Sequence, residues 1–184
     1  MSVNNDIRVQ VVTTAEQLMH AIAIRAICCS EDSGLATQQA IDADDYQATH
    51  ILAYVKQEPI GATRLRWFRD FAKIERTTFR PAYRNTRILR RCSDFVFEYV
   101  AKKGYRLLVT HSEPQAAQIW QRVCGFERAA GRPLVVAESH EPYVELIKRL
   151  PPSPDTSIFE AHPKTLFRIE GQSNKISVFE TSDE

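Results

Sequence analysis

The segment Ala72–Arg91, with the sequence AKIERTTFRPAYRNTRILRR, decides how the chain folds. Its first eight residues read as a β-strand, and Pro81 ends that strand because proline has no N–H for a sheet hydrogen bond. Apolar residues at helical spacing follow from Ile88, so a helix begins shortly after the strand. Five arginines surround this helix start: Arg80, Arg84, Arg87, Arg90 and Arg91. Because a helix N-terminus already carries about half a positive charge, the pattern favours a bound anion, or else arginines that reach into water.

The composition indicates one ordinary globular domain. The 184 residues, 43% of them hydrophobic, suffice for a sizeable core. Lys and Arg number 24 against 23 Asp and Glu, so the basic segment is a local feature and no nucleic-acid-binding surface is expected. The four cysteines lack the spacing of a zinc site, so no metal is expected. Neither a signal segment nor an apolar run of about 20 residues occurs, which favours a cytoplasmic protein that does not contact membranes.

Periodicity predicts a mixed order of strands and helices up to residue 150. One helix starts near Thr14 and ends before Ser30, a second runs from beyond Pro81 to Gly104, and a third covers residues 113–125. The predicted strands are residues 7–12, 50–55, 60–68, 71–79, 105–111, 132–139 and 143–150. This order predicts the α/β (α+β) class, with a mixed central sheet and helices on both faces. Residues 1–150 form the domain, and residues 151–184 form a Pro/Ser-rich linker and tail in which 165–171 and 175–180 are candidate edge strands.

Three segments resemble the GNAT superfamily of N-acyltransferases, which transfer an acyl group from coenzyme A to an amine. They are GATRLR at residues 61–66, AKIERTTF followed by RPAYRNTRI at residues 72–88, and AQIWQRVCGF at residues 117–126. Within the superfamily, the first half is similar to the branch of acyl-homoserine-lactone synthases and related small N-acyltransferases. That narrower similarity rests on Arg25, Asp45, His50 and Gly61–Arg64.

The resemblance implies an enzyme that transfers an acyl group, acetyl or another, from coenzyme A to a primary amine of a small molecule, without a metal. It places the coenzyme's pyrophosphate at Arg84, Asn85, Thr86, Arg87, Ile88 and Leu89, and its pantetheine arm along Thr77, Thr78 and Phe79. The family's loop carries small residues where this chain has Arg87 and Leu89, which would let the backbone approach the phosphates. Guanidinium groups could replace part of that cradle, or the loop has lost coenzyme A, or the arginines form a solvated helix face with Arg90 paired to Asp94.

Glu75 and His111 are the candidate catalytic residues. By resemblance, Glu75 lies where many family members carry their general base, and burial would raise its pKa. The alternative is an ion pair of Glu75 with a neighbouring arginine that holds the sheet. His111 at a strand end could act as base or acid, or serve structure alone. The position of the family's acidic tyrosine falls on Gln121, which can donate a hydrogen bond but cannot deliver a proton.

Arg64 and Arg66 alternate onto one strand face and are candidates for binding a carboxylate of the acceptor, unless that face is simply solvated. Two rival functions remain open at this point. One is an acyltransferase of the same fold that takes its acyl group from acyl carrier protein, docked by the arginines. The other is a catalytically inactive binding protein, since fold does not fix function. A homodimer is a further expected assembly.

Overall fold

The structure, a computed structural model, describes residues 7–33, 41–130, 142–154, 166–172 and 175–177. Within them a seven-stranded sheet has the order β1-β2-β3-β4-β5-β7-β6. The strands are β1 (Ile7–Val11), β2 (Thr49–Val55), β3 (Glu58–Trp67), β4 (Ala72–Phe79), β5 (Leu107–Ser112), β6 (Glu127–Arg128) and β7 (Val144–Arg149). The α-helices are α1 (Ala15–Ser33), α2 (Thr86–Lys102) and α3 (Pro114–Cys124), and short 3-10 helices are η3 (Ala43–Tyr46) and η4 (Pro81–Tyr83).

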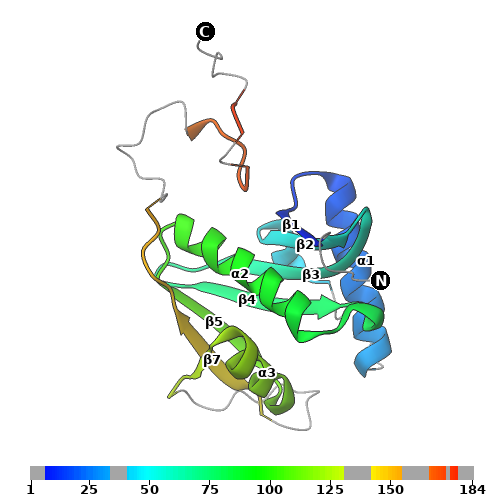
Figure 1. The fold of residues 1–184 in the computed structure, drawn as a ribbon, viewed down its shortest axis with the longest axis vertical. Coiled ribbons are helices and arrows are strands. Elements are labelled where there is room, and N and C mark those ends of the chain that lie inside the picture. Colours follow the sequence, from blue (N-terminus) through cyan, green and yellow to red (C-terminus); the bar gives the residue numbers. More distant parts are fainter. Residues whose placement is uncertain (1–6, 34–40, 131–141, 155–165, 173–174, 178–184) are drawn as a thin grey trace.

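Helices cover both faces of the sheet, as the sequence predicts (Figure 1). Helix α1 buries Ala21, Ile24 and Cys28 against β2 and β3 on one face. On the other face, α2 and α3 pack together over a larger core that includes Val96 and Trp120. The domain therefore has three layers, and the central sheet separates an α1 face from an α2 face.

Strands β4 and β5 separate soon after they meet, which divides the sheet in two. They are the parallel pair of the sheet, and they pair only at Ala72 with Leu108 and at Lys73 with Val109. Beyond Lys73 the edge of β4 that faces β5 pairs with no strand among the described residues, and the two strands diverge in Figure 1. Their separation leaves backbone N–H and C=O groups of β4 open to an incoming extended chain.

A β-bulge lies where β4 leaves β5. Ala62 pairs with Thr78 and Arg64 pairs with Glu75, so β4 has one residue more than β3 in this interval. Arg76 takes up the extra residue with a φ of 52°, a left-handed conformation that costs a non-glycine residue about 1 kcal/mol. Bulges of this kind bend a strand and change the direction of its side chains, often beside functional sites.

Most of the predicted elements are found, with three differences at the margins. Helix α1 continues to Ser33, beyond the predicted end before Ser30. The predicted strand at 132–139 lies outside the described residues, and β7 pairs instead with the two-residue strand β6, which the sequence did not predict. The predicted edge strands in the tail are not found at residues 166–171 and 175–177, which form no strand, and residues 178–180 lie outside the described part.

Part of the tail nevertheless contacts the domain. Glu170 accepts a hydrogen bond from the Tyr99 hydroxyl at the last turns of α2, and its carboxylate lies 2.6 Å from Lys103 Nζ. Gly171 approaches Val11 of β1 so closely that a Cβ there would lie 2.6 Å from the valine Cβ. The tail is therefore anchored at the C-terminal end of α2, away from the α2 N-terminus.

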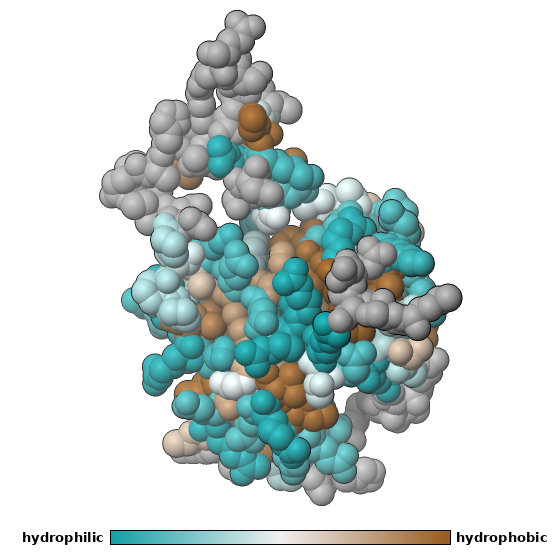
Figure 2. All heavy atoms as spheres, viewed as in Figure 1, coloured by the Kyte–Doolittle hydropathy of each residue, from teal (hydrophilic) through white to brown (hydrophobic). Residues whose placement is uncertain are grey.

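The surface over α2 and α3 is mainly hydrophilic, with apolar patches between the polar side chains (Figure 2). In the described tail, Leu166, Phe167 and Ile169 are exposed. None of the helices in the described ranges is long and apolar enough to cross a membrane.

Candidate functional site

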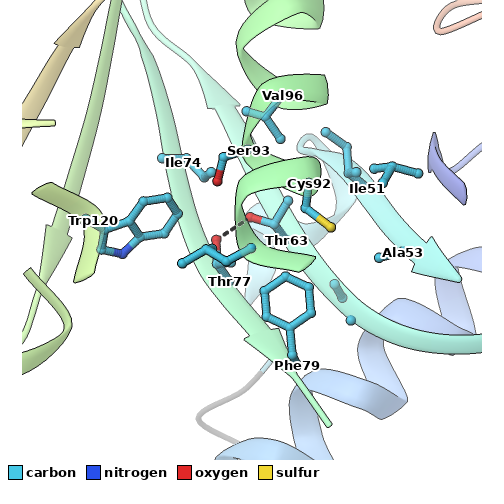
Figure 3. Close-up of a pocket in the computed structure, with 14 residues that line it drawn as sticks. Ile51, Ala53, Thr63, Ile74, Thr77, Phe79, Cys92, Ser93, Val96 and Trp120 are labelled. Carbon is cyan, nitrogen blue, oxygen red and sulfur yellow. Dashed lines mark hydrogen bonds between the residues drawn. The ribbon is translucent and has the colours of Figure 1, made fainter. Parts of the chain in front are cut away.

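An apolar pocket lies beneath α2 where β4 turns away from β5 (Figure 3). Strands β3 and β4 form its floor, α2 covers it, and Trp120 of α3 closes one side. The lining residues are Val9, Ile51, Ala53, Gly61, Ala62, Thr63, Ile74, Thr77, Phe79, Leu89, Cys92, Ser93, Val96 and Trp120. Such a pocket suits a small apolar group delivered along the free edge of β4.

Two contacts in the floor set the shape of this pocket. The Thr63 and Thr77 hydroxyls lie 2.6 Å apart and hydrogen bond across β3 and β4, beside the bulge. The Phe79 ring packs directly on Gly61, where a Cβ would lie 2.2 Å from the ring. The glycine therefore makes room for the phenylalanine, and the phenylalanine narrows the pocket.

The N-terminus of α2 adjoins this pocket. Asn85 caps the helix by accepting a hydrogen bond from the Ile88 N–H at 2.9 Å. Leu89 lines the pocket, while Ile88 is buried in the core and cannot present its side chain to a ligand. Arg87 is exposed at the first turn, where its charge can meet an anion.

Several other arginines of this segment have partners on the protein. Arg80 pairs with Glu58, and Arg84 Nε donates to the Phe79 carbonyl at 2.7 Å. Arg90 lies 3.2 Å from Asp94 and also donates to the Val123 carbonyl. The predicted pair of Arg90 with Asp94 is therefore confirmed. The basic segment combines structural contacts with side chains that extend into solvent.

On the α1 face, Arg64 is the centre of a buried ionic network. Its guanidinium donates to Asp42 at 2.6 Å, to Asp45 at 2.8 Å and to Glu75 at 2.5 Å, and its side chain is 2% exposed. Arg25 forms a two-point hydrogen bond with Asp45 at 2.6 and 3.0 Å. The network joins α1, the η3 segment, β3 and β4 directly below the bulge. Buried charges of this kind are stable only because each has its partners.

These contacts contradict one expectation for Glu75. Burial acts to raise its pKa, but hydrogen bonds and charges from Lys73, at 2.8 Å, and from Arg64 outweigh burial and leave the pKa below its usual value. The prediction of a raised pKa was therefore wrong, and Glu75 is a weaker base than expected. Its predicted ion pair is found with Arg64. That Glu75 contacts a reacting amine stays a prediction.

The geometry also argues against the acceptor site predicted at Arg64 and Arg66. Three carboxylates already form ion pairs with the guanidinium of Arg64. A carboxylate of the acceptor could bind it only by displacing one of them. Arg66 is more exposed and pairs with Asp44 at 3.1 Å. Arg64 therefore stabilises the fold beneath the site, and Arg66 remains the more accessible of the two.

His111 lies near the end of β5, and its Nε2 lies 3.0 Å from Oε2 of Glu145 on β7. Its Nδ1 is buried and has no hydrogen-bond partner among the described residues. The histidine was predicted as a catalytic candidate, but Glu145 was not. The two residues are 34 positions apart in the chain, and only the β5–β7 register brings them together.

Thiol and metal chemistry have little support in the described part of the chain. Cys92 lines the pocket, but burial raises the pKa of its thiol to about 12, so it is protonated at neutral pH and a poor nucleophile. Among the described residues, no three His, Cys, Asp or Glu side chains are grouped as a metal site requires.

The fold described above is matched by comparison with known proteins. Residues 16–126, more than half of the chain, match the acetyltransferase (GNAT) family. The chain belongs to the GNAT acetyltransferase family. This GNAT protein is thus an enzyme of the acyltransferase class, and the resemblance found in the sequence is confirmed.

A curated relative and several solved structures agree with this assignment. Over 121 residues, the chain is 28% identical to a Bacillus subtilis (strain 168) protein named "Putative acetyltransferase", covering 64% of this chain and 82% of the relative. A crystal structure described as "putative N-acetyltransferase from Lactobacillus plantarum" has a TM-score of 0.71 at 23% identity, covering 79% of this chain and 99% of that one.

Two further structures share the GNAT fold at lower identity. The acyl-homoserine-lactone synthase LasI gives a TM-score of 0.60 at 14% identity, covering 79% of this chain and 89% of that chain. A GNAT acetyltransferase from Elizabethkingia anophelis with acetyl-CoA bound gives 0.61 at 16% identity, covering 80% and 100%. At these identities the likeness concerns the fold alone.

We expect Arg64→Ala to destabilise this GNAT protein by about 3–5 kcal/mol, because it removes the buried cation that three carboxylates share and leaves each of them with fewer cationic partners. Arg66→Ala on the same strand is the matched control and should cost at most about 1 kcal/mol, since its ion pair is partly exposed. Urea unfolding of both variants measures the difference. Equal destabilisation by the two substitutions would contradict the network described above.

Gly61→Ala should displace the Phe79 ring and cost about 1–3 kcal/mol of stability through overpacking. Adding Phe79→Leu to the same chain should recover part of that loss, because the shorter side chain leaves space for the new methyl group. Urea unfolding of the wild type, both single variants and the double variant tests the coupling. Additive effects would show that the ring and the glycine do not interact.

Proposed function

We propose that this protein transfers an acyl group, most simply acetyl, from coenzyme A to a primary amine of a small molecule. The observation that carries the proposal is the free edge of β4 beyond Lys73, which leads into the apolar pocket under α2. The acetyl-CoA-bound relative of the same fold supports this choice of donor. The acceptor's identity does not enter the argument.

The pantetheine arm of coenzyme A would extend along Thr77–Phe79. This part of β4 pairs with β3 on one side, through Gly61 with Phe79 and Ala62 with Thr78. Its other side faces the gap toward β5 and offers backbone donors and acceptors to the amide groups of the arm. The thioester at the end of the arm would then reach the pocket beside Thr77 and Trp120.

The pyrophosphate would lie at the N-terminus of α2, a helix of 17 residues whose dipole favours an anion. Arg87 in the first turn would supply charge, and Arg84 just before the Asn85 cap could turn toward the phosphates. The bulky side chains at positions 87 and 89 limit close backbone approach. Forked guanidinium groups would therefore take a larger share of phosphate binding than the backbone does.

The amine would attack the thioester directly, in a complex that contains both substrates. A covalent acyl-enzyme would require a reactive nucleophile in the pocket, but the Cys92 thiol is protonated at neutral pH. The Thr63 and Thr77 hydroxyls already hydrogen bond to each other. Direct attack uses the pocket only to hold and orient the acyl group, which its apolar lining does well.

Calorimetry of acetyl-CoA binding tests the proposed donor. We expect the wild type to bind, and the double variant Arg84→Ala with Arg87→Ala to bind about tenfold more weakly, a change of about 1.4 kcal/mol. The matched control replaces two exposed arginines on α3 and β6, Arg122→Ala with Arg128→Ala, and should leave binding unchanged.

The binding experiment separates two failures. If the wild type does not bind acetyl-CoA, the proposed donor is wrong. If the wild type binds and the double variant binds equally well, coenzyme A is the donor but the arginines do not hold it. Thiol release from acetyl-CoA, followed over a panel of amino acids, diamines and amino sugars, then identifies the acceptor class.

A second candidate donor is acyl carrier protein, favoured by one observation. The bulky residues at positions 87 and 89 crowd the phosphate loop. Arg87 and Arg91 are exposed in the first two turns of α2, the helix that covers the pocket. An acidic carrier protein would bind such a surface through long-range attraction.

Under this alternative, turnover with acyl carrier protein should exceed turnover with the same acyl-CoA. Its kcat/KM should also fall steeply between about 0.05 and 0.3 M salt, because salt screens exposed charges. The acyl-CoA reaction under the same conditions is the control. A carrier-protein reaction slower than the coenzyme A reaction at every salt concentration rejects this alternative.

A further inference from the structure

His111 is on β5, the strand on the far side of the gap from β4. It forms a hydrogen-bonded pair with Glu145 on the next strand, β7. They are directly opposite each other in the β5–β7 register, with Nε2 and Oε2 3.0 Å apart. A carboxylate accepts but does not donate at neutral pH, so Nε2 carries the hydrogen of this bond. The neutral imidazole then has its lone pair on Nδ1, which makes Nδ1 the atom that can take a proton.

The Nδ1 atom of His111 makes no hydrogen bond within the described structure. It is buried, and no hydrogen-bond partner for it is found among the described residues. A buried acceptor left without a partner costs about 1–3 kcal/mol, so such atoms are rare and call for an explanation. A substrate N–H that arrives during the reaction would supply the missing donor.

The position of His111 in the sheet brings it to the gap. The last paired residues of β4 and β5 are Lys73 and Val109, and two residues further along each strand stand Glu75 and His111. Side chains two residues apart share a face, so both lie on the α1 face. Ile74 and Thr77, in contrast, line the pocket on the α2 face. The thioester and the proton acceptor thus approach the gap from opposite faces.

The charged groups around this position distinguish His111 from Glu75. Lys73 and Arg64 engage both oxygens of Glu75 and weaken it as a base. Glu145 of β7 contacts His111, and its side chain is 35% exposed. Tyr143, just before β7, is a further titratable group on this side of the sheet. It interacts electrostatically with Glu113 before α3, Cys29 of α1 and Arg76 of the bulge.

We propose that His111 is the general base of the acyl transfer and that Glu145 is its positioning residue, with the amine entering from the α1 face. This step rests on the proposed function. The protonated amine gives one proton to Nδ1, and the neutral nitrogen attacks the thioester carbon. The new C–N bond forms as the C–S bond breaks, the thiolate leaves, and the nitrogen loses a second proton to solvent. The thiolate takes one proton from solvent and His111 returns its proton to solvent, so the products are amide, free thiol and one proton.

The first experiment reads the tautomer of the His111 ring from its two ring-nitrogen NMR signals at high pH in the full chain, with His111→Gln to assign them among the five histidines. We expect the hydrogen on Nε2, because Glu145 accepts a hydrogen bond from that atom. Glu145→Leu removes the acceptor and should lower the share of this tautomer. Glu127→Leu on the neighbouring strand β6 is the matched control and should leave the tautomer unchanged.

The second experiment measures thiol release from acetyl-CoA with the amine of highest turnover in the panel. His111→Gln should reduce kcat at least tenfold with the KM for acetyl-CoA unchanged, since the amide cannot take a proton. Glu145→Leu should lower kcat with the KM for acetyl-CoA unchanged, and Glu145→Gln, which keeps a hydrogen-bond acceptor, should restore most of it. Thermal unfolding of each variant confirms that the fold is retained.

The outcomes are distinct from those of the proposed function. The same tautomer in the wild type and Glu145→Leu would overturn the coupling, whatever the acceptor is. An unchanged kcat in His111→Gln would overturn the role of the base while leaving coenzyme A as donor. Loss of acetyl-CoA binding in the wild type would instead remove the proposed function, and calorimetry reports that separately.

Discussion

The guanidinium of Arg64 is the contact on which the split in the sheet depends. It joins Asp42 and Asp45 of the η3 segment to Glu75, the last residue of β4 before the bulge. Because all three carboxylates bind this one buried cation, the loop, β3 and β4 are held together. The bulge at Arg76 then begins from a fixed point, and β4 leaves β5 in a defined direction. The free edge and the pocket both follow from this arrangement.

The sheet also separates two chemical environments. On the α2 face the pocket is lined by aliphatic and aromatic side chains, with hydroxyls that bond to each other. The α1 face carries the carboxylates and guanidinium groups of the Arg64 network and, on β5, the imidazole of His111. Under the proposed function, a thioester and a charged amine have opposite requirements for solvation, and the gap would let them meet without sharing a binding surface.

The sequence predicted much of the fold but little of the side-chain partnership. The alternation in β3 and β4, Pro81, and the helical spacing after Ile88 are local signals, and they located the elements correctly. The roles of Glu75 and His111 depend on register between distant strands, which no local pattern records. The sequence placed Glu75 where a base belongs, yet its pKa is lowered by Lys73, two residues earlier on the same strand, and by Arg64 on β3. Glu145 had no signal of its own, because a charged residue in a strand usually just faces water.

The anchoring of Glu170 has a practical consequence for expression of the protein. The composition predicts a domain boundary after Leu150. The Tyr99 hydroxyl and Lys103 nevertheless contact Glu170, which lies beyond that boundary. A chain shortened at the linker would leave the buried hydroxyl of Tyr99 without its acceptor and would uncover the side of Val11 against which Gly171 packs. The shortest chain suited to crystallisation therefore ends after residue 171, although the predicted domain stops about twenty residues earlier.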